Sequence, residues 1–98
     1  GVSGLPEQFG NYTLEHLFGD VWQGKELALE ERSLITCTIL TALAREPEQL
    51  FHFAAAKRLG VPREKLLGMI THTAHYAGWP NAMGAIRSLN KVWPEEET

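Results

Sequence analysis

The chain has 98 residues, of which 44% are hydrophobic and 21% charged, with a formal net charge of −3. This length predicts a single domain, residues 1–98, with a thin core. The negative charge and the absence of a Lys/Arg run exclude a basic nucleic-acid-binding surface. No stretch is typical of a membrane span or of a signal peptide. The single cysteine, Cys37, excludes an internal disulfide and a CxxC motif and suits a reducing cytoplasm, so we expect a cytoplasmic protein.

The first half of the chain predicts an N-terminal arm followed by two helices. Residues 1–10 hold three glycines and a proline, so we interpret them as an arm or an extended lead-in. Residues 12–22 have apolar side chains at helical spacing and predict a first helix, with a break at Gly19. A second helix is predicted from about Leu29 to Arg45, where Pro47 stops it or opens the next one.

Three further helices complete an all-α fold of about five helices. We expect them at residues 49–59, 62–77 and 80–92. Gly60 is a plausible C-terminal cap of the first, Pro62 suits the first turn of the second, and Gly78 ends it. Residues 94–98 read as a solvated acidic tail. No alternating pattern of useful length predicts a β-strand.

Residues 34–44 form a helical stretch with no charged side chain on any face. A helix that is apolar nearly all round is normally buried nearly all round, and a chain of this size can hardly surround one. A neighbouring subunit would cover it, so we expect a homo-oligomer of at least three subunits. The alternative is a central helix wrapped by its own chain, with threonines bonded back to the backbone.

Residues 72–82 carry a concentration of groups that can move protons or form a pocket wall. His72, His75, Tyr76 and Trp79 lie at i, i+3, i+4 and i+7 of a predicted helix, which places the first three on one side. Histidine titrates near neutrality, so this stripe suits a proton-transfer pocket. The alternative is a pair of structural histidines beneath an aromatic lid. In the first case, at least one of the two histidines would share a pocket with His52.

His52 lies in an apolar helix near the corner made by Pro47. A buried imidazole there needs a partner for each ring nitrogen, so a structural role is the alternative to a functional one. The histidines do not have metal-ligand spacing, and no glycine-rich phosphate loop or nucleophile elbow occurs. We therefore expect no metal and no cofactor. Cys37, within the apolar helix, is interpreted as a core residue.

Three segments of the chain together resemble the carboxymuconolactone decarboxylase family. They are residues 17–22 with Leu29 and Arg32–Thr36, then Arg45–Leu50 with His52, Ala55 and Leu59–Val61, then Glu64–Ile70 with His72 and Tyr76–Ala82. The resemblance covers about residues 17–92. It implies an all-helical fold that assembles into rings, commonly homotrimers or homohexamers.

The resemblance also separates two kinds of chemistry. In the alkylhydroperoxidase D-like branch, a CxxC pair precedes a histidine. If that histidine corresponds to His52, the two cysteine positions are occupied here by Arg45 and Glu48. Thiol peroxidase chemistry is therefore not expected. In the decarboxylase branch, which serves aromatic compound catabolism, a lactone bearing a carboxylate loses carbon dioxide without a cofactor. The matching residues there include Arg32 and His52.

These residues fit a cofactor-free lyase acting on a small carboxylated lactone or related anionic cyclic substrate. Arg32 is predicted to orient the anion, and His52 and His72 are predicted acids. Tyr76 is predicted to donate to the enolate oxygen, with His75 and Trp79 as substrate-binding residues. The same set would serve an isomerase or a proton-abstracting lyase. The competing hypothesis is a non-catalytic oligomer that binds a small ligand or has a structural role.

Overall fold

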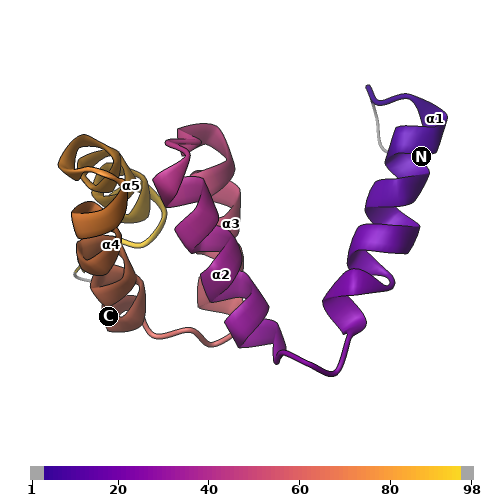
Figure 1. Ribbon diagram of the computed structural model, residues 1–98, viewed down its shortest axis with the longest axis horizontal. Coiled ribbons are helices and arrows are strands. Elements are labelled where there is room, and N and C mark those ends of the chain that lie inside the picture. The colour runs from indigo at the N-terminus through magenta and orange to yellow at the C-terminus, as the bar shows by residue number, and fades with distance from the viewer. Residues whose placement is uncertain (1–3, 96–98) are drawn as a thin grey trace.

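The computed structural model describes residues 4–95, and their regular elements are all helical (Figure 1). This confirms the predicted all-α class. The elements in chain order are α1 (Glu7–Asn11), the π-helix η1 (Tyr12–Phe18), the 3₁₀-helix η2 (Val21–Gln23), α2 (Leu29–Ala42), α3 (Glu46–Arg58), α4 (Arg63–Ala77) and α5 (Trp79–Val92). No helix among residues 4–95 is long and apolar enough to cross a membrane.

Helices α2–α5, called the body below, pack around one core. Helix α3 packs against α2 and α5, and α4 also packs against α2 and α5. The core consists of buried apolar side chains from all four helices and the residues that join or follow them: Cys37, Phe53, Ala56, Val61, Leu66, Ile70, Ala74, Ala82, Ala85, Leu89 and Trp93. The core is small, as expected for a chain of this length.

Buried polar side chains tie the helices of the body together. Gln49 on α3 is fully buried; its amide nitrogen donates to the carbonyl oxygen of Leu40, and its amide oxygen accepts from the hydroxyl of Ser88. Arg63 at the start of α4 donates to the carbonyl oxygen of Trp93 and to Asn90. Because Gln49 and Arg63 have partners on other segments, these contacts fix the helices relative to one another.

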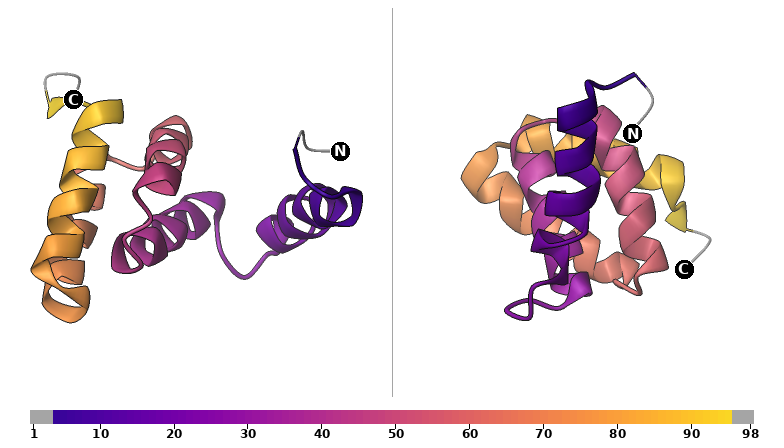
Figure 2. Two further views of the ribbon diagram at one scale, coloured as in Figure 1. Left: turned by 90° about the horizontal axis from the view of Figure 1, so that it is seen from above. Right: turned by 90° about the vertical axis from the view of Figure 1, so that its right-hand side faces the viewer.

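Residues 5–23, called the N-terminal segment below, stand apart from the body (Figures 1 and 2). The expected extended lead-in is wrong in part, because Glu7–Asn11 is helical: it follows Pro6, and the Gly10 amide donates to the Pro6 carbonyl oxygen. Residues 1–3 and 96–98, part of the predicted arm and acidic tail, lie outside the described residues.

The predicted break at Gly19 is confirmed. A Cβ at this position would lie 2.6 Å from the carbonyl oxygen of Glu15, a distance that backbone atoms do not allow. Only glycine therefore fits the end of η1. Helical structure resumes at Val21 for a single short turn.

The boundaries of the later helices follow the predicted glycines and prolines. Gly60 and Gly78 have φ angles of 91° and 108°, which favour glycine, and end α3 and α4. Pro47 lies in the first turn of α3, which begins at Glu46 rather than near residue 49. Helix α2 ends at Ala42 rather than Arg45, because the chain turns sharply through Ala44, at a φ of 58°.

Helix α2 is buried on one face only. Cys37 and Thr41 are fully buried, whereas Ile35, Ile39 and Leu43 are 44%, 51% and 65% exposed in the single chain. The threonines bond back to the backbone as the alternative interpretation anticipated: Thr36, Thr38 and Thr41 each donate to the carbonyl oxygen four residues earlier. One chain therefore does not wrap this helix.

Candidate functional site

A cavity of about 410 Å³ lies where the base of the N-terminal segment meets the body. Its walls come from η1, η2, α2 and α3, and most of them are apolar. The lining residues are Phe18, Trp22, Leu29, Phe51, His52, Ala55, Arg58 and Leu59. The cavity is thus a largely apolar pocket with a few polar groups, as is usual for a site that binds a small molecule.

The period of α3 determines which of its side chains reach this cavity. Phe51, Ala55 and Arg58 follow i, i+4, i+7 spacing, so they share one face of the helix with His52. The opposite face carries Gln49, Phe53 and Ala56, which are fully buried in the body. Core packing of one face therefore presents the other to the cavity.

The far wall of the cavity is aromatic and comes from the N-terminal segment. Phe18 and Trp22 are four residues apart, and their ring centroids lie 5.9 Å from one another. Leu29, at the start of α2, adds an aliphatic group. The base of the N-terminal segment thus completes a wall that α3 alone would leave open.

His52 is partly buried at the cavity. Its ring meets that of Phe51 edge-on at a centroid distance of 5.0 Å. Burial lowers the pKa of the imidazole from its ordinary value, and the Glu48 carboxylate opposes this in part. His52 is therefore largely neutral at pH 7 in the absence of ligand, and an anion in the cavity would favour its protonated form.

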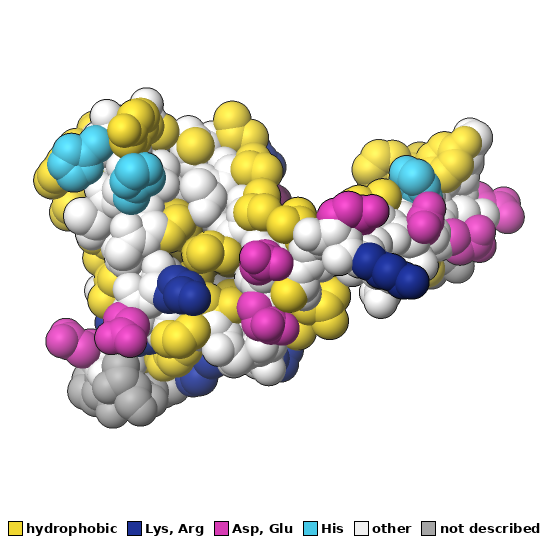
Figure 3. Space-filling model, turned by 60° about the horizontal axis from the view of Figure 1, so that its bottom comes forward, with side chains coloured by type: hydrophobic (Ala, Val, Ile, Leu, Met, Phe, Trp, Pro, Cys, Tyr) yellow, Lys and Arg dark blue, Asp and Glu magenta, His cyan; other side chains and the backbone are white. Residues whose placement is uncertain are grey.

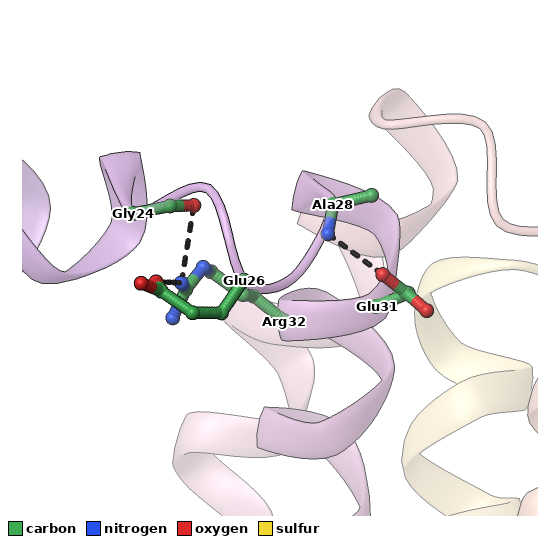
Figure 4. A network of polar contacts seen from close by, with 5 residues as sticks. All are labelled: Gly24, Glu26, Ala28, Glu31 and Arg32. Carbon is green, nitrogen blue, oxygen red and sulfur yellow. Dashed lines mark hydrogen bonds and ion pairs between the residues drawn. The ribbon is translucent and has the colours of Figure 1, made fainter.

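Arg32 has partners within the chain and does not line the cavity (Figure 4). Its Nη2 atom donates to the carbonyl oxygen of Gly24 at 3.2 Å and lies 3.7 Å from the Glu26 carboxylate. Its side chain is 13% exposed, and among the described residues the buried Nε atom has no hydrogen-bond partner. Nearby, the Glu31 carboxylate accepts from the amide of Ala28 and closes the first turn of α2. Arg32 thus holds the loop that leads into α2.

The aromatic and histidine side chains of α4 and the start of α5 form two ring pairs at the surface. The centroids of His72 and Tyr76 are 4.9 Å apart, and those of His75 and Trp79 are 5.3 Å apart. Tyr76 and Trp79 are 81% and 59% exposed. In Figure 3 histidine side chains gather beside hydrophobic ones at one edge of the body.

These groups are not brought to the His52 cavity within one chain. His72, His75 and Tyr76 line a separate open depression with Gly68 and Thr71, and Trp79 lines neither. The predicted spacing on one side of the helix is confirmed for the three that share this depression. The expected pocket shared with His52 is not formed by a single chain.

The cysteine is not placed for thiol chemistry. Cys37 is fully buried, and burial raises the pKa of its thiol to about 12. Its Sγ donates a weak hydrogen bond to the backbone carbonyl of His52. Because the thiolate is the reactive form, this residue is inert near neutral pH. Within residues 4–95, no group of three or more His, Cys, Asp and Glu side chains could hold a metal ion.

The sequence profile of the carboxymuconolactone decarboxylase family matches residues 7–91. The chain belongs to the carboxymuconolactone decarboxylase family. It is also 33% identical over 89 residues to 4-carboxymuconolactone decarboxylase of Acinetobacter baylyi, a match that covers 91% of this chain. The chain spans 66% of the length of that relative. The resemblance inferred from the three sequence segments is confirmed.

Of the residues that line the cavity in this family member, only His52 was predicted from the sequence as a site residue. Arg58 could have been found from helical spacing, because it follows Phe51 by seven residues on α3. Phe18 and Trp22 gave no such signal. They reach the cavity only through the turn at Gly19 and Asp20, which spacing along one helix does not describe.

Proposed function

We propose that this protein is a cofactor-free carboxy-lyase that removes carbon dioxide from a small carboxylated unsaturated lactone, with His52 as its general acid. The observation that carries the proposal is a histidine at an apolar cavity of small-molecule size in a member of the carboxymuconolactone decarboxylase family. The similarity to a 4-carboxymuconolactone decarboxylase supports that class of substrate.

The chemistry needs few groups. The bond between the ring carbon and the carboxylate breaks, carbon dioxide leaves, and the electron pair passes into the conjugated lactone. A proton from His52 then neutralises the carbanion or enolate. An anionic substrate raises the pKa of the neutral imidazole, so His52 takes up its proton as the substrate binds. The walls around the developing charge are mostly apolar.

The remaining predicted site residues lie outside the His52 cavity in the single chain. Arg32 already bonds Gly24 and faces Glu26, so its geometry favours holding the loop over binding the substrate. The other predicted roles require a neighbouring subunit whose surface at α4 and the start of α5 reaches the cavity. These roles are catalysis by His72 and Tyr76 and substrate binding by His75 and Trp79.

The test uses 4-carboxymuconolactone and follows the loss of its ultraviolet absorbance. We expect turnover by the wild-type protein and a decrease of roughly 100-fold or more in kcat for His52→Gln. His16→Gln is the matched control, because His16 is exposed on η1, away from the cavity. Full activity in a correctly assembled His52→Gln protein would exclude the acid role. Binding without turnover by the wild type would favour the non-catalytic ligand binder.

We also propose that the protein assembles as a homotrimer or homohexamer. The support is the amount of apolar surface that one chain leaves uncovered, on the outer face of α2 and along the N-terminal segment. That segment exposes, among others, Phe9, Tyr12 and Leu14, at 59%, 59% and 51%. Figure 3 shows hydrophobic side chains on both parts of the molecule. Exposed apolar surface of this extent is typical of subunit interfaces.

A further inference from the structure

Arg58 is the last residue of α3 and lies at the His52 cavity. Of the described residues that line this cavity, it alone carries a permanent charge. The other walls are aromatic and aliphatic apart from His52 and the indole nitrogen of Trp22. A guanidinium at the edge of such a pocket is suited to a carboxylate, which it can bind through two parallel hydrogen bonds.

The guanidinium of Arg58 is free for such a ligand. Among residues 4–95, it has no hydrogen bond or ion pair within the chain. Arg32, Arg45 and Arg63, by contrast, bond to Gly24, Glu48 and Asn90. The neighbouring cation Lys57 lies over the ring of Trp93, 5.2 Å from its centroid, on another side of α3.

The spacing of Arg58 and His52 suits a ligand that spans both. Six residues of an α-helix correspond to a rise of about 9 Å, and both side chains line the same cavity. Ala55, with its short side chain, lies between them and leaves room there. A small ring with an anionic arm would therefore place the ring near His52 and the arm near Arg58.

We propose that Arg58 is the residue that binds a carboxylate in this cavity, and that the carboxylate it binds is one that stays in the product. This rests on the proposed decarboxylation. An ion pair to the departing carboxylate would stabilise the ground state more than the transition state, in which that charge disperses. The substrate is then a lactone with two carboxylates, one lost beside His52 and one held by Arg58.

A cation at the end of α3 also has a simpler effect, because it interacts favourably with the partial negative charge of a helix C-terminus. Lys57 in the same turn provides that interaction as well. A role limited to the helix end would change stability and leave ligand binding intact. The experiment therefore measures ligand binding directly.

The probe is muconolactone, an unsaturated lactone that has a carboxylate on its side arm but lacks the ring carboxylate that decarboxylation would remove. Its methyl ester, in which the arm is uncharged, is the comparison ligand. Binding is measured by calorimetry and by the NMR signals of the His52 ring in the chain of residues 1–98. We expect Arg58→Gln to weaken binding of the acid by about 10-fold or more. We expect Arg58→Lys to restore part of it, and the ester to bind the wild type as weakly as the acid binds Arg58→Gln.

Arg87→Gln is the matched control, because it removes the same charge from an exposed position on α5 outside the cavity. It should bind the acid like the wild type. Equal binding of acid and ester, unchanged binding by Arg58→Gln, or no binding by the wild type would overturn the inference. Failure of the proposed function has a different signature: the acid binds through Arg58, yet 4-carboxymuconolactone is not decarboxylated.

Discussion

The Nη2 atom of Arg32 donates a hydrogen bond to the carbonyl oxygen of Gly24, 3.2 Å away, and so links α2 to the loop that carries the N-terminal segment. A Cβ on Gly24 would lie 2.8 Å from the same nitrogen. The guanidinium therefore occupies the space that a larger residue would need. Through this contact the body holds the loop that follows Trp22. Trp22 itself forms part of the wall of the His52 cavity.

Loss of the Arg32 guanidinium should destabilise the protein and loosen the cavity wall. We expect Arg32→Gln to lower the free energy of unfolding by about 1–3 kcal/mol, since a bond from a charged donor and part of its packing disappear. Glu26→Gln is the control and should cost less than about 1 kcal/mol, because Glu26 is 84% exposed. Denaturant titration measures both. An Arg32→Gln protein as stable as the wild type would contradict the linking role.

The titration of His52 should report its partial burial. Burial lowers the pKa of the folded-state imidazole below its ordinary value of 6.5. As the pH falls below that value, the unfolded chain takes up a proton before the folded protein does. The His52 contribution to stability is thus complete above pH 6.5 and is lost as the pH falls through the folded pKa.

NMR titration of the ring protons checks this shift, and denaturant titration across the same pH range checks its effect on stability. The pH dependence of the free energy of unfolding that is due to His52 should vanish in His52→Gln. A bound carboxylate ligand should move the pKa of His52 upward. A midpoint at or above 6.5 in the ligand-free protein would show that the imidazole is not desolvated.

A charge on the outer face of α2 should disrupt assembly. Ile35, Ile39 and Leu43 lie four residues apart on one stripe of the helix. We expect Ile39→Glu to shift the protein toward monomers, because an interface that buries this stripe would bury an unpaired carboxylate. Sedimentation velocity measures the change, with Lys91→Gln on the exposed part of α5 as the control. A wild-type protein that is monomeric at micromolar concentration would contradict the proposed homotrimer or homohexamer.

The hydrogen bonds of Gln49 should contribute strongly to stability. Gln49→Ala takes one of two donors from the Leu40 carbonyl oxygen, which keeps the Arg45 amide. It also takes one bond from the Ser88 hydroxyl and leaves a cavity. We expect a loss of about 2–4 kcal/mol in thermal or denaturant unfolding. Ser88→Ala completes a double-mutant cycle, and a coupling near zero would show that the contact between the two side chains contributes little. Gln49→Leu fills a similar volume without hydrogen bonds, so it separates the effect of the cavity from the effect of the lost hydrogen bonds.

The helices and most of their ends follow from local features of the sequence. Gly60 and Gly78 must adopt positive φ, and Pro47 and Pro80 fit only the first turns of helices, so these positions are fixed by local sterics. Helix α2 ends three residues before its predicted end at Arg45, because the turn at Ala44 has no glycine to mark it. That turn is stabilised from outside the helix: the side chains of Gln49 and Asn81 donate to the carbonyl oxygens of Leu40 and Ala42.

Which chemical groups share a cavity depends on the packing of the helices and could not be predicted from helical spacing. Spacing along α4 paired His72 with Tyr76 correctly, because both lie on one helix. It did not show that this pair lies in a different depression from His52. Arg32 was the plausible anion-binding residue in the sequence, yet the fold directs it to Gly24 and brings Arg58 to the cavity. Helical periodicity orders side chains around one axis, whereas the meeting of η1, η2, α2 and α3 depends on packing between segments far apart in the chain.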